Sequence, residues 1–367
     1  MNIMAFTRRA RCALLGATLS IGLAGPAFAQ TLYVANAGSN TVSIIRPNEG
    51  NSIQNVAVGA NPQGIAISPN SARAYTANAG AGTVSVVDTA NHVLLTTIPV
   101  GSTPYGVAVS PNGARAYSAN FGSDTVSVIN TSTNTVIGTV NVEDGPISVA
   151  VSPDNAFVYA VNFNSSTVSV IRTSDNTVVA SVPAQTSAYN VAFSNDGSFA
   201  YVANGNGSSL TKIQTSDHTV IANYAVGSTP HASAVHPNGA RVYVASYNAS
   251  GVVYGYDTTV HAQTSATNVG SNPHALAFSG DGSRLYVANY GVHGGGGPGT
   301  VSVINTATNG VVDTITVGVN PASIAVGPTT TSTPAAVPTL TEWAMILLAV
   351  ALAGFAALTL QRRRQTA

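Results

Sequence analysis

The chain has 367 residues, of which only 7% are charged, and its 13 lysines and arginines balance its 13 acidic residues. Residues 30–340 alone hold seven cations and twelve anions, so the body of the chain is mildly acidic. This balance argues against proteins that bind nucleic acid through its phosphates. The only cysteine, Cys12, lies near the N-terminus, which leaves the rest of the chain without disulfides or thiol chemistry.

Residues 1–29 have the pattern of a secretory signal peptide. Three arginines up to Arg11 precede an apolar stretch at residues 13–23, and the tripeptide Ala-Phe-Ala ends at Ala29. Small residues at these positions are typical of a signal cleavage site, so we expect cleavage after Ala29. The export route stays open between the Sec machinery and the twin-arginine machinery. The pair Arg8-Arg9 is present, but the residues that should follow it in a twin-arginine signal are missing.

A four-residue motif, typically Tyr-Val-Ala-Asn, then recurs at a nearly constant spacing. Five successive intervals between its tyrosines are 42 residues and the sixth is 43. The tyrosines are Tyr33, Tyr75, Tyr117, Tyr159, Tyr201, Tyr243 and Tyr286. A fixed period of about 20–50 residues is typical of repeat architectures. We expect these tyrosines to be buried spacers in the core.

Residues 106–142 show what one repeat contains. Four apolar or β-branched runs alternate with short turns of Gly, Pro, Asn, Ser and Thr, and the turn at Pro111-Asn112-Gly113 is typical of a tight hairpin. Four antiparallel strands in about 42 residues predict one blade of a β-propeller. One such sheet cannot bury both of its faces, whereas blades stacked around a ring can.

The repeats predict an all-β, seven-bladed propeller over residues 30–327. The innermost strands should start near Gly64, Gly106, Ser148, Asn190, Ala232, Ala275 and Ala322. The chain enters the repeat out of phase, with a second-strand motif at residues 32–36 and a first-strand run at residues 322–326. We therefore expect these two segments to pair and to close the ring, which removes free sheet edges.

The composition changes after the last repeat. Residues 328–339 form a linker rich in Pro and Thr, which should be extended. Residues 340–361 include an uncharged stretch of eighteen residues from Trp343 to Leu360, just long enough for one transmembrane helix. Residues 362–367 begin with three arginines, which predicts a cytoplasmic tail and an anchored body on the outside.

Both parts resemble known families. The C-terminal layout closely resembles the IPTL-type sorting signal of PEP-CTERM-like proteins that exosortases process, with Val337 and Ala344 as mild departures from the usual Ile and Gly. The residues that carry this resemblance are Pro338, Thr339, Leu340, Glu342, Trp343, Arg362, Arg363 and Arg364. It implies a temporary inner-membrane anchor that is cut near residues 338–343. The body resembles the YVTN-repeat family of β-propellers, which includes surface-layer and YncE-like proteins; this resemblance is specific for the fold and weak for function.

The candidate binding site is the mouth of the central channel, where the repeats differ from one another. Two positions per repeat should converge there: the head of each innermost strand and the residue after each second strand. Aromatic and histidine side chains occupy many of them, namely Tyr105, Tyr189, His231, His274, Phe121, Phe163, Tyr247 and Tyr290. They would either stack on a sugar or another flat ligand or only cap the channel.

Two metal sites are weaker alternatives. His231 and His274 occupy matching positions in neighbouring repeats and would hold a metal together with His293. Glu143, Asp144 and Asp124, with Asn120, would hold Ca²⁺ on the same face. Histidines and carboxylates on polar loops are more often simply solvated or hydrogen-bonded than bound to a metal. The asparagines that end the repeated motif should bond the backbone of their own turns.

No motif of a known catalytic centre occurs in the sequence, so we expect a protein that is not an enzyme and needs no cofactor. The leading hypothesis is an exported β-propeller, displayed on the cell surface or secreted, that binds an envelope polysaccharide or protein. The alternative is an extracytoplasmic enzyme of the lactonase or quinoprotein type, which depends on a metal or cofactor. Nucleic acid is not an expected partner.

Overall fold

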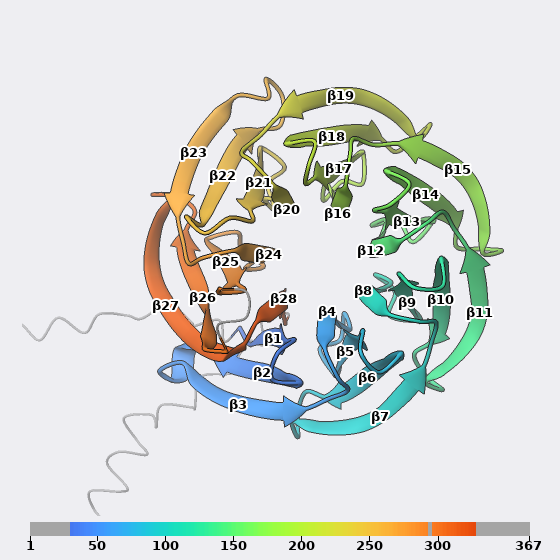
Figure 1. Cartoon of the computed structure of the whole chain (residues 1–367), viewed down its shortest axis with the longest axis horizontal. Helices are drawn as coiled ribbons and strands as arrows, with labels where there is room; N and C mark the ends of the chain where they lie inside the picture. The colour runs from blue at the N-terminus through green and yellow to red at the C-terminus, as the bar shows by residue number, and fades with distance from the viewer. Residues whose placement is uncertain (1–29, 293–295, 328–367) are drawn as a thin grey trace, which may run out of the picture. The chain divides into compact units, whose positions relative to one another are not determined.

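The computed structural model describes residues 30–292 and 296–327, and in these residues the chain forms seven four-stranded sheets around a central channel (Figure 1). Blade 1 joins the two ends of this region in the order β28-β1-β2-β3, and blades 2 to 7 follow the chain from β4–β7 to β24–β27. All neighbouring strands within the blades are antiparallel, as in β1 with β28 and β5 with β6. The predicted fold class and number of blades are confirmed.

Each blade contributes one strand to each of four concentric layers. The innermost strands are β4 (Pro62–Ile67), β8 (Pro104–Val109), β12 (Pro146–Val151), β16 (Ala188–Phe193), β20 (Pro230–Val235), β24 (Pro273–Phe278) and β28 (Pro321–Val326). The second strands are β1 (Leu32–Asn36), β5 (Arg73–Asn78), β9 (Arg115–Asn120), β13 (Phe157–Asn162), β17 (Phe199–Asn204), β21 (Arg241–Ser246) and β25 (Arg284–Asn289).

The third layer is β2 (Thr41–Arg46), β6 (Thr83–Asp88), β10 (Thr125–Asn130), β14 (Thr167–Arg172), β18 (Ser209–Gln214), β22 (Val252–Asp257) and β26 (Pro298–Asn305). The outer layer is β3 (Ser52–Ala57), β7 (Val93–Pro99), β11 (Thr135–Asn141), β15 (Thr177–Pro183), β19 (Thr219–Ala225), β23 (Gln263–Asn268) and β27 (Gly310–Val319). A short 3₁₀ helix, Pro47–Glu49, lies between β2 and β3.

The innermost strands begin about two residues earlier than the sequence suggested. Six of the seven start at a proline, and the residue before each start has a positive φ, such as Asn61 (54°) and Thr103 (50°). Proline fixes φ and lacks an N–H, so it suits the first residue of a strand that leaves a tight turn. Apolar periodicity did not reveal these starts because the turn chemistry, not the pattern, sets them.

The ring closes through β1 and β28, as predicted. Leu32 lies opposite Val326 and Val34 lies opposite Ile324 in an antiparallel register. Leu32, Val34 and Ile324 then share one apolar cluster with Tyr286 of blade 7. The joint is therefore packed against its neighbour as the other blade interfaces are.

The seven motif tyrosines are core residues, with exposed fractions of 0–5%. Each packs against the next blade: Tyr33 shares a cluster with Ile65 of blade 2, and Tyr75 shares one with Val107 of blade 3. Where a hydroxyl finds a partner, it is on that next blade, as in Tyr159 with His218 Nδ1 at 2.7 Å. The tyrosine column therefore holds successive blades together.

The expectation that the motif asparagines bond the backbone of their own turns was wrong for most of them. Asn120 donates from Nδ2 to Thr125 Oγ1 at 3.0 Å and to Ser127 Oγ at 2.9 Å, both on the next strand. Asn36, Asn78, Asn162 and Asn289 repeat this pattern, and Asn204 adds two backbone oxygens. These amides are buried, so the hydroxyls of the paired strand are the partners within reach.

Blade 6 supports this interpretation, because the asparagine and both hydroxyl residues that it would bond are all replaced there. Ser246 stands where the other blades have Asn, and its paired strand has Val252 and Tyr254 where blade 3 has Thr125 and Ser127. An amide without the two hydroxyls would be buried unsatisfied, which costs about 1–3 kcal/mol. The three residues therefore behave as one unit.

We predict that a chain ending at Asn320, which lacks β28, is destabilised by at least ~3 kcal/mol, because burial of Ile324 alone contributes about 1.5–3 kcal/mol and β1 would become an open edge. Urea unfolding followed by tyrosine fluorescence measures the loss. A chain ending at Gly327 is the matched control and should unfold as the intact protein does. Equal midpoints for the two truncated chains would contradict closure as a source of stability.

Candidate functional site

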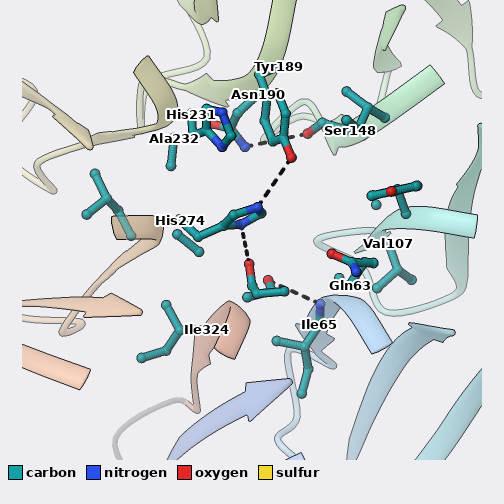
Figure 2. Close-up of a pocket in the computed structure, with 18 of the residues that line it drawn as sticks. Gln63, Ile65, Val107, Ser148, Tyr189, Asn190, His231, Ala232, His274 and Ile324 are labelled. Atoms are coloured by element: carbon teal, nitrogen blue, oxygen red, sulfur yellow. Dashed lines mark hydrogen bonds between the residues drawn. The ribbon is translucent and has the colours of Figure 1, made fainter. Parts of the chain in front are cut away.

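A cavity of about 200 Å³ lies in the central channel and is lined by all seven innermost strands (Figure 2). Its wall includes the seven strand-head residues, Gln63, Tyr105, Ile147, Tyr189, His231, His274 and Ala322. A second ring of small or polar residues follows directly after them: Gly64, Gly106, Ser148, Asn190, Ala232, Ala275 and Ser323. The residues that line the channel thus vary most in size at the heads and are mostly small just beyond them.

A β-bulge positions the head residues. The pairing of β4 with β5 passes from Pro62↔Asn78 to Gly64↔Ala77, so Gln63 is skipped. The same irregularity falls at Ile147, Tyr189, His231, His274 and Ala322, and in blade 3 it spans Tyr105. A bulge leaves its extra residue unpaired and redirects its side chain. Here all seven redirected side chains line the cavity.

Three rings form a stack on blades 5 and 6. Tyr189 and His231 lie 4.0 Å apart between centroids and 18° from parallel, and His231 and Tyr247 lie 4.1 Å apart and 8° from parallel. His274 meets this stack edge-on, at 5.7 Å from Tyr189, 5.3 Å from His231 and 5.6 Å from Tyr247. Such stacked and T-shaped pairs hold aromatic rings in defined orientations.

The remaining predicted residues extend this cluster. Tyr290 stacks on His274 at 5.5 Å, Phe163 lies edge-on to Tyr189 at 5.9 Å, and Tyr105 contacts Phe121 at 5.5 Å. Blades 3 to 7 therefore share one aromatic wall made of the eight candidate residues. They are all half-buried, so they both cap the channel and reach its surface.

Hydrogen bonds orient His274. Its Nδ1 lies 2.7 Å from the carbonyl oxygen of Ala322, which can only accept, so Nδ1 carries the proton. In the neutral ring Nε2 is then the acceptor, and the Tyr189 hydroxyl, 3.3 Å away, donates to it. His274 thus links the start of β28 to Tyr189 in the aromatic stack (Figure 2).

Residues without aromatic rings occupy the opposite side of the mouth. Blades 1 and 2 present Ala322 and Gln63 at their strand heads and Ala37 and Ala79 after their second strands. Gln63 faces the cavity from the side opposite Tyr189 and His231 (Figure 2). These four positions therefore contrast with the aromatic wall on blades 3 to 7.

The second ring of the channel was not among the predicted site residues. Asn190 donates to Ser148 Oγ at 3.5 Å and accepts from the Ser233 backbone N–H at 3.0 Å, while Ser323 Oγ accepts from the Ile65 N–H at 3.3 Å. A signal was present, because the residue after each strand head also varies between repeats and is polar in three of them.

The carboxylates proposed for Ca²⁺ serve as contacts between loops. Glu143 Oε2 accepts from Thr167 Oγ1 at 2.6 Å, Asp144 Oδ1 accepts from Asn164 Nδ2 at 2.9 Å, and Asp124 Oδ1 accepts from the Gly145 N–H at 2.9 Å. In residues 30–292 and 296–327 no three His, Cys, Asp or Glu side chains are grouped so that they could hold a metal ion.

Several predicted segments lie outside the described residues. They are His293, the signal peptide with Ala29, the linker, the sorting motif and the basic tail. Within the described part of the chain no helix is long and apolar enough to cross a membrane. The predicted transmembrane helix also lies outside this part.

We predict that the mouth tyrosines make the protein sensitive to alkali. Burial, followed by the neighbouring Tyr290, raises the pKa of Tyr247 to about 12, above the value of about 10 in an unfolded chain. The stabilising effect of the neutral phenol is complete below pH 10 and is lost as the pH rises through about 12. Tyr247→Phe should therefore lose less stability than the wild type between pH 10 and 12, each measured by urea unfolding relative to its own value at pH 7. Parallel losses in both proteins would contradict this.

Comparisons with known proteins agree with the fold and with the C-terminal motif. The family model "Lactonase, 7-bladed beta-propeller" matches residues 46–204, the "Choice-of-anchor I domain" model matches residues 189–326, and the "IPTL-CTERM motif" model matches residues 335–364. No curated protein sequence matches the chain.

Among solved structures, the chain is similar to one of Kuenenia stuttgartiensis hydrazine synthase, with 21% identity, a TM-score of 0.65 and coverage of 71% of this chain and 88% of that chain. It is similar to a functionally unknown protein of Desulfotomaculum acetoxidans, with 16% identity, a TM-score of 0.70 and coverage of 82% and 99%. It is also similar to a candidate 6-phosphogluconolactonase of Bacteroides uniformis, with 16% identity, a TM-score of 0.69 and coverage of 82% and 100%. At these identities the likeness concerns the fold alone.

Proposed function

Because the chain is a seven-bladed β-propeller of the lactonase type that carries an IPTL-CTERM motif, we propose that it is an exported binding protein of the cell envelope, displayed on the surface or secreted, without enzymatic activity. The motif implies an exosortase-type sorting system and export. The proposal adds that the propeller is the part that acts outside the cell and that the channel mouth is its binding site.

The observation that carries the proposal is the chemistry of the channel wall. The described residues that line the cavity include no Lys, Arg, Asp or Glu, and they combine tyrosine and histidine rings with the amides of Gln63 and Asn190 and the hydroxyl of Ser148. Aromatic surface beside a few fixed hydrogen-bonding groups is typical of sites for small neutral ligands. An uncharged sugar residue at the end of a polysaccharide matches this chemistry and this volume.

The arrangement of the rings also decides where such a ligand would lie. Tyr189 and Tyr247 cover both faces of His231, so a ligand would meet the rings of Tyr189 and Tyr247 and not the faces of His231. His274 makes T-shaped contacts with all three rings and fixes their orientation. The rings are thus oriented before a ligand arrives, which reduces the entropy lost on binding.

We predict that the intact propeller binds neutral envelope polysaccharide from its own cells and that Tyr247→Ala weakens binding at least ~10-fold, which corresponds to about 1.4 kcal/mol. Isothermal titration with purified oligosaccharide fragments measures this. Val312→Ala is the control, since Val312 is 54% exposed on the outer strand β27, remote from the channel. Equal binding by both variants would place the site elsewhere, and no binding by the wild type would contradict the proposal.

The match to the lactonase model favours one second candidate, a lactone-hydrolysing enzyme. Among the described cavity residues, His231 and His274 are the side chains able to take up a proton near neutral pH. His274 uses both ring nitrogens in contacts with Ala322 and Tyr189, which leaves it poorly placed as a general base. Hydrolysis of δ-gluconolactone above the uncatalysed rate, with or without Ca²⁺, and its loss in His274→Ala would replace the binding proposal by this one.

We also predict that the exported protein is cut near residues 338–343 in cells that contain an exosortase. Mass spectrometry of the surface or secreted form should show a C-terminus in this region. Replacing Pro338, Thr339 and Leu340 together by alanine should leave the uncut chain in the membrane fraction, whereas Val312→Ala should be processed normally. A released protein that still ends at Ala367 would contradict sorting by this motif.

A further inference from the structure

Lys212 is the only lysine of the sequence, and it lies in the core of blade 5. It pairs with Tyr201 across β17 and β18, at a position where five other blades have Ile or Val and blade 6 has Gly. Only 8% of its surface is exposed. Charged side chains are rarely buried to this degree without a partner of opposite charge, so its surroundings decide what the amine can do.

The contacts of its amine are one hydrogen bond and two rings. Lys212 Nζ donates to the Thr258 carbonyl oxygen at 2.9 Å and lies 4.1 Å from the centroid of Phe199 and 5.7 Å from that of Tyr201. The ion pairs found in the described residues, Arg46–Glu49 and Arg172–Asp175, do not include it. An ammonium group has three donors, so one hydrogen bond leaves the amine with hydrogen-bonding capacity, and no carboxylate of the described residues forms an ion pair with it.

Blades 2 and 3 contain a similar hydrogen bond to the next blade, made by an arginine. Arg73 and Arg115, which open their second strands, donate to the carbonyl oxygens of Thr131 and Thr173 on the next blade. Blade 5 has Phe199 at this position, and Lys212 reaches the matching carbonyl of Thr258 from the neighbouring strand. One hydrogen bond between blades is thus retained, but an arginine that is always charged is replaced by an amine that can lose its proton.

Lys212 lines a pocket between blades 5 and 6. This pocket has a volume of about 460 Å³, and its wall combines Phe199 and Pro237 with the polar side chains of Ser194, Asn238 and Thr259. A small ligand with one apolar side and several hydroxyl groups matches this wall. The site is separate from the channel mouth, because the two cavities share no lining residue.

The titratable groups around Lys212 come from both blades. Asp196 and Tyr201 of blade 5 line the pocket, and His261 of blade 6 interacts electrostatically with both Lys212 and Asp257. Burial lowers the pKa of Lys212, which increases the neutral fraction of the amine. Burial and then the charge of Lys212 lower the pKa of His261, although Asp257 acts in the opposite direction. A lysine that is desolvated in an apolar environment keeps more of its amine neutral, which is a known way to activate it.

We propose that Lys212 is a nucleophilic amine that captures small polyhydroxy aldehydes, such as the open-chain end of a short reducing sugar, in the pocket between blades 5 and 6. The neutral amine attacks the carbonyl carbon to form a carbinolamine, which loses water to give an imine. The proton released from the ammonium goes to solvent, and no oxidant or further reactant is required.

Glycolaldehyde with cyanoborohydride at pH 7 tests this, because reduction turns the imine into a stable secondary amine. We expect the peptide that contains Lys212 to gain one adduct, at a rate at least ~10-fold higher than that of Nα-acetyl-lysine, whose pKa is about 10.4. The pH at which the modification rate of Lys212 reaches half its maximum should be lower than the corresponding pH for Nα-acetyl-lysine. Lys212→Arg retains a cation and should gain no adduct at this position.

Two further measurements keep the result unambiguous. In urea, Lys212 should react no faster than Nα-acetyl-lysine, because the folded pocket is the source of its reactivity. Formaldehyde is the small control: modification by formaldehyde but not by glycolaldehyde would overturn the assigned ligand class. An unmodified or slowly modified Lys212 in the folded protein would overturn the proposal and leave the amine as a contact between blades only.

Discussion

The structure depends on one constraint, which is that every sheet of this chain is apolar on both faces. Tyr159 and Val168 of one blade, for example, share a buried cluster with Val191 and Ala200 of the next. A sheet of this kind is stable only if a neighbour covers each face, and the ring is the arrangement in which all blades have two neighbours. Closure through β28 and β1 is the condition for the first and last blades to satisfy it.

The candidate site is formed by the first residues of the innermost strands, at the inner edge of the same ring. The strand heads are bulged, so their side chains leave the pairing pattern and line the channel instead of packing between blades. These side chains therefore do not have to fit between two blades, whereas the seven motif tyrosines do and are the same in every repeat. Variation at Tyr189, His231 and His274 costs the fold little, and this freedom allows one part of the ring to become an aromatic wall while another stays open.

Blades 5 and 6 depart from the repeat in a second place. Lys212 enters the core where aliphatic residues are usual, Phe199 replaces an arginine, and Ser246 replaces the motif asparagine. The buried amine of Lys212 has a compensating partner in the Thr258 carbonyl oxygen, and Phe199 lies beneath it. A repeat that satisfies its buried polar groups locally can change in sequence without changes in the other repeats, because each repeat contacts only its neighbours.

The spacing of the tyrosines predicted the number of blades, and the four apolar runs of each repeat predicted its strands. The out-of-phase entry of the chain predicted the pairing that closes the ring. The repeat pattern also brought the eight aromatic and histidine residues to one mouth, since equivalent positions of a closed ring meet at its axis. The sequence could not show that Tyr189, His231 and Tyr247 stack, that His274 bonds Ala322, or that the asparagines bond Thr and Ser side chains. Those contacts join residues of different strands or blades, and their geometry is set only when the bulges and the twist of the ring place them together.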